Sequence, residues 1–161
     1  MNTNSIRLDK LSDLELMLLR TKVRAEIRTR GIADSVGSIG EQLAIEHFRR
    51  MPNLPKLQPA PRGTKNVDAL SRSGDRFSIK TICEGAKTGT VYPEPENKDK
   101  QLFEYMLIVK LTGDWTLSSI HQLSWSDFLR VRSWDKRMNA WYVGYSDRVL
   151  KTATPLFTPS K

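Results

Sequence analysis

Long apolar runs and cysteine pairs are both missing from this sequence. Its longest apolar stretches, Leu16–Leu19 and Met106–Val109, are far shorter than the roughly 20 residues that a membrane-spanning helix needs. The single cysteine, Cys83, has no partner for an internal disulfide and no second cysteine with which to form a zinc site. The N-terminus also lacks the basic and then apolar pattern of a secretory signal. We therefore expect a cytoplasmic protein that does not span a membrane.

Acidic residues are in the minority, with 18 Asp and Glu against 26 Lys and Arg, for a net charge of +8. Basic surfaces attract and retain nucleic acids through phosphate contacts, although ribosomal proteins and many ordinary enzymes are also basic. A length of 161 residues favours one domain. Within it we expect an N-terminal helical segment (1–36), a core (37–145) and a C-terminal tail or helix (146–161).

The pattern Ser-x-x-Glu occurs twice and predicts two helix starts. Ser12–Glu15 has the sequence of a capping box, and the helix that it opens should stop at Gly31. Ser38–Glu41 has the same pattern and should open a second helix that runs to about Arg50. The prolines that follow this second segment are expected to end it, because proline disrupts the helical hydrogen-bond pattern.

Two strand-like segments flank a turn-rich pentapeptide in the middle of the chain. Val67–Leu70 and Arg76–Cys83 lie on either side of Ser71–Asp75, so we expect an antiparallel hairpin. Because side chains alternate along a strand, Ser78 and Lys80 should share one face of the second strand. This geometry matters for the chemistry considered below.

The remaining elements form a series of short strands and helices around an irregular excursion. In order, we expect a short edge strand at Lys56–Gln58, an irregular segment at Glu84–Lys100, a buried strand at Phe103–Leu111, strands at Trp115–Leu117 and Ser119–Leu123, a short helix near Phe128, a last strand at Trp141–Val143 and a terminal helix from Ser146. This alternation indicates an α/β sandwich around a mixed or antiparallel sheet.

The hairpin carries residues that suit phosphodiester hydrolysis. That reaction needs carboxylates to hold a divalent metal, and a nearby cation to stabilise the charge that develops. Asp68 lies on the first strand, and Ser78-Ile79-Lys80 lies on the second. This spacing resembles the PD-(D/E)xK nuclease superfamily, in which an Asp is followed after a turn by Glu or Asp, any residue, and Lys. The sequence departs from that pattern at Ser78.

The resemblance covers roughly Gly37–Val143 and implies a restriction-endonuclease-like core, a mixed β-sheet flanked by helices, as in small type II restriction endonucleases. It implies that Asp68 and a glutamate bind Mg²⁺ or Mn²⁺ together with the backbone carbonyl of Ile79. Lys80 would orient the attacking water or stabilise the pentavalent phosphate. Ser78 would hold a metal-bound water.

Two glutamates are candidates for the missing metal ligand. Glu41 lies in a segment that looks like the Gly-Glu-x-x-Ala helix that often precedes the core in this superfamily. Glu94 lies fourteen residues beyond Lys80, at the distance where the relocated acid appears in Ser-x-Lys variants. We rank Glu41 first, because a helix beside the sheet holds a ligand more firmly than a proline-flanked loop. Their simpler roles are a helix cap for Glu41 and a solvated loop charge for Glu94.

Lysines and arginines gather in two further segments that could contact phosphates. The first choice is the irregular segment with Lys87, Lys98 and Lys100, and the second is a cluster around Trp134 with Arg130, Arg132, Lys136 and Arg137. Arginine and lysine bind the DNA backbone without reading its sequence, and an aromatic ring among them can stack on a base or a sugar. Ordinary solvated charge is the alternative for each segment.

These patterns favour a metal-dependent endonuclease of restriction or repair type, with duplex DNA as its substrate. A homodimer is expected by analogy if both strands are cut, because paired sites match the symmetry of the duplex. The first alternative is a catalytically inactive DNA-binding or partner-binding module on the same fold, in which Ser78 records the loss of a ligand. A basic RNA-associated protein whose hairpin matches by chance is the second.

Overall fold

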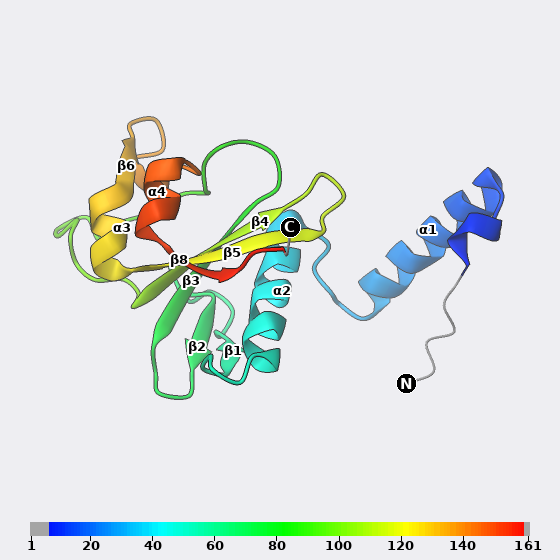
Figure 1. Cartoon of the computed structure of the whole chain (residues 1–161), viewed down its shortest axis with the longest axis horizontal. Helices are drawn as coiled ribbons and strands as arrows, with labels where there is room; N and C mark the ends of the chain where they lie inside the picture. Colours follow the sequence, from blue (N-terminus) through cyan, green and yellow to red (C-terminus); the bar gives the residue numbers. More distant parts are fainter. Residues whose placement is uncertain (1–6, 160–161) are drawn as a thin grey trace. The chain divides into compact units, whose positions relative to one another are not determined.

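The computed structural model describes residues 7–159 and divides the chain into two compact units, 1–35 and 36–161. The first unit contains a short 3-10 helix, η1 (Leu8–Lys10), and the helix α1 (Asp13–Thr29) (Figure 1). Ser12 and Glu15 form the predicted capping box, in which each side chain accepts a hydrogen bond from the main chain of the other residue. Gly31, with a φ of 64°, follows the helix in the left-handed conformation that glycine tolerates best.

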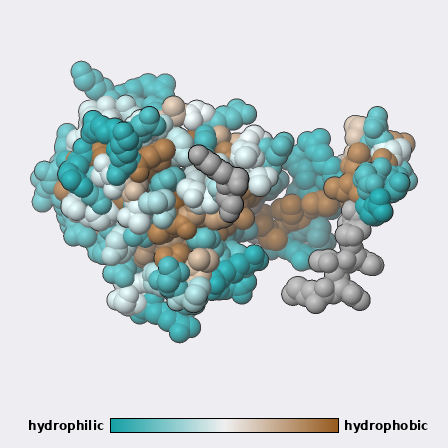
Figure 2. Space-filling view, viewed as in Figure 1, coloured by the Kyte–Doolittle hydropathy of each residue, from teal (hydrophilic) through white to brown (hydrophobic). Residues whose placement is uncertain are grey.

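Apolar side chains are exposed along α1 (Figure 2). Leu14, Met17 and Leu18 are each more than half exposed, and none of the residues of α1 is buried. The capping box and the helix propensity of these residues therefore account for α1 as a local element, without support from a hydrophobic core.

The second unit is built on a mixed six-stranded sheet in the order β1-β2-β3-β4-β5-β8. Its strands are β1 (Leu57–Pro59), β2 (Ala69–Ser71), β3 (Arg76–Ile82), β4 (Tyr105–Leu111), β5 (Leu117–Ser124) and β8 (Thr154–Phe157). Neighbours pair antiparallel, except that β3 and β4 are parallel. A separate two-stranded sheet pairs β6 (Arg132–Asp135) with β7 (Ala140–Val143). The α/β class with a mixed sheet is confirmed.

Helices cover both faces of the large sheet (Figure 1). The helix α2 (Val36–Arg50) packs on one face, while α3 (Trp125–Val131) and α4 (Asp147–Thr152) pack on the other. Alternate residues of β4 enter the two cores: Leu107 lies in the cluster with α2, and Ile108 lies in the cluster with α3 and α4. A strand buried on both faces reads as an unbroken apolar run, which explains why the sequence predicted β4 so clearly.

The predicted hairpin is present, since β2 and β3 pair antiparallel with Ala69 opposite Phe77. Phe77 and Ile79 pack beneath α2 together with Phe48, and Ile82 packs in the opposite core. The strand residues therefore alternate between the faces as predicted.

The start of the second predicted helix differs from expectation. α2 begins at Val36, two residues before Ser38, so Ser38 lies inside the first turn and is not the capping residue. Val36 itself packs against the core cluster beneath α2, and this burial accounts for the longer helix. The capping role predicted for Glu41 is thus wrong, and its carboxylate is available for another function.

Three predictions for the C-terminal third of the chain are also corrected. The two strands expected between Trp115 and Leu123 are one continuous strand, β5. Trp141–Val143 belongs to β7, which pairs with the unpredicted β6 and lies outside the large sheet. The last strand is β8, at the sheet edge beside β5, where Pro155 is tolerated because an edge strand has one unpaired side. The short helices α3 and α4 were expected.

In the stretch from residue 7 to residue 159, no helix combines the length and the apolar character that crossing a membrane requires.

Candidate active site

Asp68 lies immediately before β2 and connects the hairpin to the strand beside it. Its main-chain N–H donates to the carbonyl of Phe77 at 2.8 Å, and its own carbonyl accepts from the N–H of Ala60, just after β1, at 2.9 Å. Its side-chain Oδ2 accepts a hydrogen bond from the N–H of Ile79 at 2.6 Å. Three hydrogen bonds thus fix both the backbone and the carboxylate of this residue.

The side chain of Asp68 takes the place of a strand neighbour. The pairing of β2 with β3 ends at Phe77, although β3 continues to Ile82, so one edge of β3 is open beyond that point. The carboxylate fills the first position of this open edge by accepting the Ile79 amide. Because the N–H and C=O groups of a strand residue point to the same side, the carbonyl of Ile79 lies on this edge as well.

Glu41 approaches this edge from the second turn of α2. The pKa of the Glu41 carboxyl is raised, first because burial desolvates its charged form and second because the negative charge of Asp68 lies nearby; the positive charge of Lys80 offsets part of this effect. Both charges therefore act on Glu41. The structure brings together three residues that the sequence singled out from three separate segments.

A glycine allows α2 to lie this close to β3. A side-chain Cβ at Gly40 would fall 1.9 Å from Oγ1 of Thr81, far inside any real contact distance. Thr81 Oγ1 also donates a hydrogen bond to the carbonyl of Gly37 at 3.4 Å. The contact seats the first turns of α2 on the strand that carries Lys80, and it places Glu41, the residue after Gly40, beside the open edge.

Ser78 occupies the position where the superfamily pattern has an acid. Its side chain has no exposed surface, and its Oγ has no hydrogen-bond partner in the structure. A buried hydroxyl without a partner has unfilled hydrogen-bonding capacity, which an ordered water commonly satisfies. Ser78 cannot replace a carboxylate as a charged ligand, and the acid whose charge interacts with that of Asp68 is Glu41, on α2.

Glu94 lies apart from this group. It lines a hollow of about 360 Å³ with Pro95, Glu96, Asn97 and Lys100, in the segment between β3 and β4. Its charge is not among the causes of the raised pKa of Glu41. Across residues 7–159 there is no cluster of three or more Asp, Glu, His or Cys side chains that could hold a metal ion. The structure thus supplies two carboxylates, Glu41 and Asp68, without a third.

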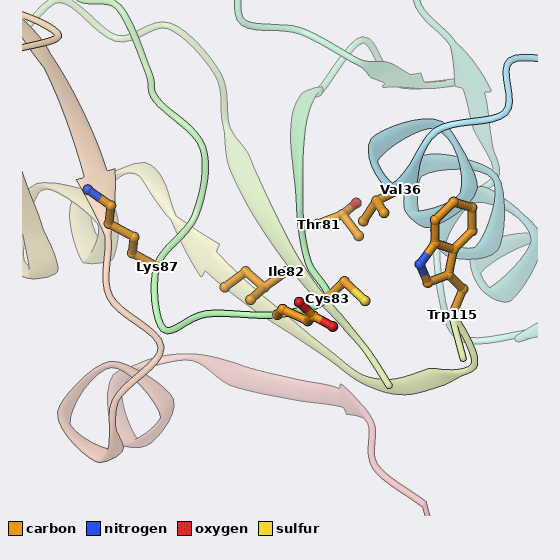
Figure 3. Close-up of a pocket in the computed structure, with 7 residues that line it drawn as sticks. Val36, Thr81, Ile82, Cys83, Lys87 and Trp115 are labelled. Carbon is orange, nitrogen blue, oxygen red and sulfur yellow. The ribbon is translucent and has the colours of Figure 1, made fainter. Parts of the chain in front are cut away.

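A groove of about 440 Å³ opens at the C-terminal end of β3 (Figure 3). Figure 3 shows Val36 and Thr81 close to Trp115, with Cys83 between this group and Lys87. Trp115 is 39% exposed and has a φ of 62°, which is rare for a bulky residue. Trp115 was expected to begin a strand, but it precedes β5, and its position just after Gly113-Asp114 is the sequence signal for an exposed turn residue.

The two basic segments predicted to contact DNA form one surface. Lys87 pairs as an isolated bridge with Gly144, just after β7, and the ammonium of Lys98 lies 4.3 Å from the ring centroid of Trp134 on β6. Some of these cations are neutralised by acids, because Lys87 pairs with Asp135, Arg130 with Asp127 and Arg132 with Asp99. An ion-paired cation must exchange partners to bind a phosphate, so the cations without an acidic partner are the better candidates.

The site as a whole combines two carboxylates, an open strand edge with a main-chain carbonyl, and the ammonium group of Lys80, a half-buried residue. Comparison with models of known protein families gives no match, and comparison with curated protein sequences gives none either. The function of this chain is therefore inferred from the geometry and chemistry of the site.

Proposed function

We propose that this protein is a metal-dependent endonuclease that hydrolyses phosphodiester bonds of duplex DNA, on a restriction-endonuclease-like core. The observation that carries the proposal is the arrangement of Asp68, whose carboxylate is anchored on the open edge of β3, with Glu41 and Lys80 close enough for their charges to interact. The mixed sheet, with the Gly-Glu-x-x-Ala helix packed on one face, also supports this core.

The donor set fits a hard divalent cation. Glu41, Asp68 and the carbonyl of Ile79 offer oxygen atoms only, and Mg²⁺ is commonly bound through one or two carboxylates with water in its other positions. Burial and, second, repulsion by Asp68 raise the pKa of Glu41, and a cation between the two carboxylates would relieve that repulsion. A bound Mg²⁺ or Mn²⁺ would polarise the phosphate and lower the pKa of a water molecule.

The residues of the chain have distinct tasks in this proposal. Asp68 and Glu41 hold the ion, and the Ile79 amide keeps the Asp68 carboxylate in one orientation. The ammonium of Lys80 orients the attacking water or stabilises the negative charge that develops on the phosphate, as preorganised cations do in phosphoryl transfer. Attack in line with the leaving oxygen then breaks one strand.

Cleavage of supercoiled plasmid with Mg²⁺ or Mn²⁺ tests this proposal. Asp68→Asn, Lys80→Gln and Glu41→Gln should each lower the cleavage rate by at least about 100-fold, the usual loss when one preorganised charge is removed from a site of this kind. Asn at position 68 can still accept the Ile79 amide, so this variant tests charge and preserves the hydrogen bond. Circular dichroism should show that all three variants remain folded.

Exposed or remote residues of the same type provide matched controls. Asp114→Asn, Lys151→Gln and Glu46→Gln change the same kinds of side chain, and Glu46 lies on the same helix as Glu41. These variants should keep rates within about twofold of wild type, since surface changes away from a site rarely matter. Glu94→Gln should also resemble the controls. Wild-type cleavage that survives Asp68→Asn would exclude this site as its source.

A catalytically inactive DNA-binding module on the same fold is the second candidate. The observation that favours it is Ser78, a buried neutral residue where the superfamily pattern has an acid. Duplex binding without cleavage in either metal would support this candidate over the nuclease. The homodimer and the cytoplasmic location remain predictions of the sequence, and light scattering of the purified protein tests the first of them.

A further inference from the structure

The turn that joins β6 to β7 is held in a fixed conformation. The main-chain N–H groups of Arg137 and Met138 donate to Oδ1 of Asp135 at 3.0 and 3.1 Å, so that one carboxylate organises the turn. Asn139 closes it with a φ of 50°, a conformation that asparagine tolerates better than most residues. The hairpin end is thus a preformed projection.

Positive charge on this turn has no local acid to neutralise it. Lys136 and Arg137 are both exposed, and neither side chain makes an ion pair within residues 7–159. The neighbouring Asp135 is already bound by Lys87 and by the amides of the turn. Two adjacent cations on a fixed support therefore face solvent, unlike Arg130 and Arg132, which have acidic partners.

An apolar side chain follows these cations. Met138 is 38% exposed at the end of the hairpin, where its neighbours Arg137 and Asn139 are polar. Phosphate contacts by cations, combined with an apolar side chain that enters a groove, form a recurring way to bind duplex DNA. Methionine suits such a contact, because its flexible and polarisable side chain adapts to uneven surfaces.

The base of the hairpin is firmly anchored. Trp134 and Trp141 pack edge to face across the two strands, 4.6 Å between ring centroids, and the Arg132 guanidinium lies 3.9 Å from the centroid of Trp141. Val91 pairs with Trp141 through two backbone hydrogen bonds of 2.7 and 2.9 Å. The turn is therefore carried on a rigid support.

The segment that pairs with the base of the hairpin also contacts the chain that carries Asp68. Tyr92, next to Val91, accepts a hydrogen bond at its carbonyl from Nδ2 of Asn66 at 3.1 Å, and Asn66 lies two residues before Asp68. One short segment thus contacts both the hairpin and the chain that carries the candidate metal ligand. A duplex bound by the hairpin would lie against an element that also positions the site.

We propose that the β6–β7 turn inserts into a groove of duplex DNA, with Lys136 and Arg137 against phosphates and Met138 against the base edges. The inference rests on the proposed function, because it names the element that grips the proposed substrate. The partner is duplex DNA because the β6–β7 turn combines cations for the phosphates with a single wedge-like apolar side chain. Proteins that bind single strands instead present a row of exposed aromatic rings, which this turn lacks.

Binding is measured by fluorescence anisotropy with a labelled duplex of about 20 base pairs, roughly two helical turns. The buffer contains EDTA, so that no cleavage occurs, and salt is varied between roughly 50 and 200 mM. Lys136→Gln/Arg137→Gln should bind at least about tenfold more weakly, and its plot of log affinity against log salt should be shallower by about 1.8, or 0.9 for each lost phosphate contact.

A double variant with the same net charge provides the control. Arg72→Gln/Lys151→Gln removes two exposed cations from the β2–β3 turn and from α4. Its salt slope should change by less than about 0.5, because charges outside the contact release few counterions. Equal losses for the two double variants would overturn the proposal in favour of a general effect of net charge.

Met138→Ala separates insertion from simple charge attraction. It should weaken binding about threefold to tenfold with an unchanged salt slope, since the lost contact is apolar. Wild-type affinity for Met138→Ala would overturn insertion, and equal or tighter binding of a single strand of the same length would overturn the assignment to duplex DNA. The binding assay contains no metal and so does not depend on cleavage. Failure of the wild-type protein to cleave plasmid with Mg²⁺ or Mn²⁺ would refute the nuclease proposal alone, whereas unchanged duplex binding by the turn variants would refute this inference alone.

Discussion

The sequence Ser-x-x-Glu occurs at the start of two helices, and its two glutamates have opposite environments. Glu15 accepts hydrogen bonds from the N–H and the hydroxyl of Ser12, and these bonds lower the pKa of its carboxyl. Glu41 lies inside α2, where burial and the charge of Asp68 raise the pKa of its carboxyl. The first glutamate stabilises its helix, and the second is kept in an unfavourable electrostatic environment. This contrast is the reason that Glu41, and not Glu15, is proposed as a metal ligand.

The largest expected change in stability comes from a substitution at the close contact between α2 and β3. Gly40→Ala would place a Cβ within 3 Å of three side-chain atoms of Thr81, so α2 must shift away from β3. We expect the free energy of unfolding of the second unit to fall by about 2 kcal/mol or more, as overpacking of a close backbone contact does. Urea unfolding followed by fluorescence measures this loss.

The same helix contains the control for this variant. Gly37→Ala meets no atom within 4 Å and should stabilise α2 by up to about 1 kcal/mol, because alanine is the better helix former. Thr81→Gly in the Gly40→Ala background should restore much of the lost stability, since it removes the clashing side chain. If Gly40→Ala were as stable as Gly37→Ala, the close packing of α2 on β3 would be wrong.

Removal of the N-terminal cap of α1 tests the stabilising role of the Ser12–Glu15 capping box. Ser12→Ala leaves the N–H of Glu15 without its side-chain acceptor and should reduce the stability of this helix by about 1 kcal/mol. Amide hydrogen exchange in the first turn of α1 reports this loss directly. Thr29→Ala, at the other end of α1, should leave exchange in the first turn unchanged. Equal protection in Ser12→Ala would show that the capping box contributes nothing.

A third glutamate shows what an ordinary ion pair contributes. Glu104 accepts from the side chain and the main chain of Arg76, and the Arg76 side chain is the main cause of the lowered pKa of Glu104. The resulting stability is present above the unfolded pKa of about 4.3 and is lost as the pH falls through the lower folded pKa.

Glu104→Gln should therefore destabilise the protein by less than about 1 kcal/mol at neutral pH, because the pair is partly exposed. The difference from wild type should shrink as the pH falls below about 4, where the wild-type carboxylate also becomes protonated. Urea midpoints at a series of pH values provide the measurement. A difference that stayed constant over this range would assign the effect to packing instead of charge.

The smallest expected change in the free energy of unfolding is an increase, not a decrease. Glu41→Gln removes a half-buried charge that is repelled by Asp68, so the free energy of unfolding should rise by less than about 1 kcal/mol while cleavage is lost. Glu46→Gln on the same helix should instead lower the unfolding midpoint slightly, because Arg49 and Arg50 hold the pKa of Glu46 at about 2. If Glu41→Gln destabilised the protein, Glu41 would be a structural residue.

The elements predicted from the sequence are those with local signals. The cap at Ser12, the hairpin around Ser71–Asp75 and the apolar run of β4 each have a pattern that needs no distant partner. The strands β6 and β8 were missed because their stability comes from pairing with β7 and β5. The start of α2 was misplaced because burial of Val36, a tertiary effect, extended the helix past its apparent cap.

The candidate site was predictable to a similar degree. Asp68 and Lys80 followed from their spacing around a turn, and Glu41 was ranked above Glu94 because a helix holds a ligand firmly. The need for glycine at position 40 was not recognised, because it arises from the close contact with Thr81, which is distant in sequence. The distinction between paired and unpaired cations in the basic segments was equally hidden, because it depends on acids supplied by other elements.

The hydrogen bond from the Ile79 amide also bears on which ions this protein would accept. With Oδ2 of Asp68 committed to that amide at 2.6 Å, the carboxylate would present Oδ1 to the ion that we propose it holds. Calcium is often chelated by both oxygens of a flexible carboxylate, whereas magnesium keeps a compact octahedral shell of single contacts and water. If the proposed site holds a metal, anchoring one oxygen would therefore favour magnesium over calcium.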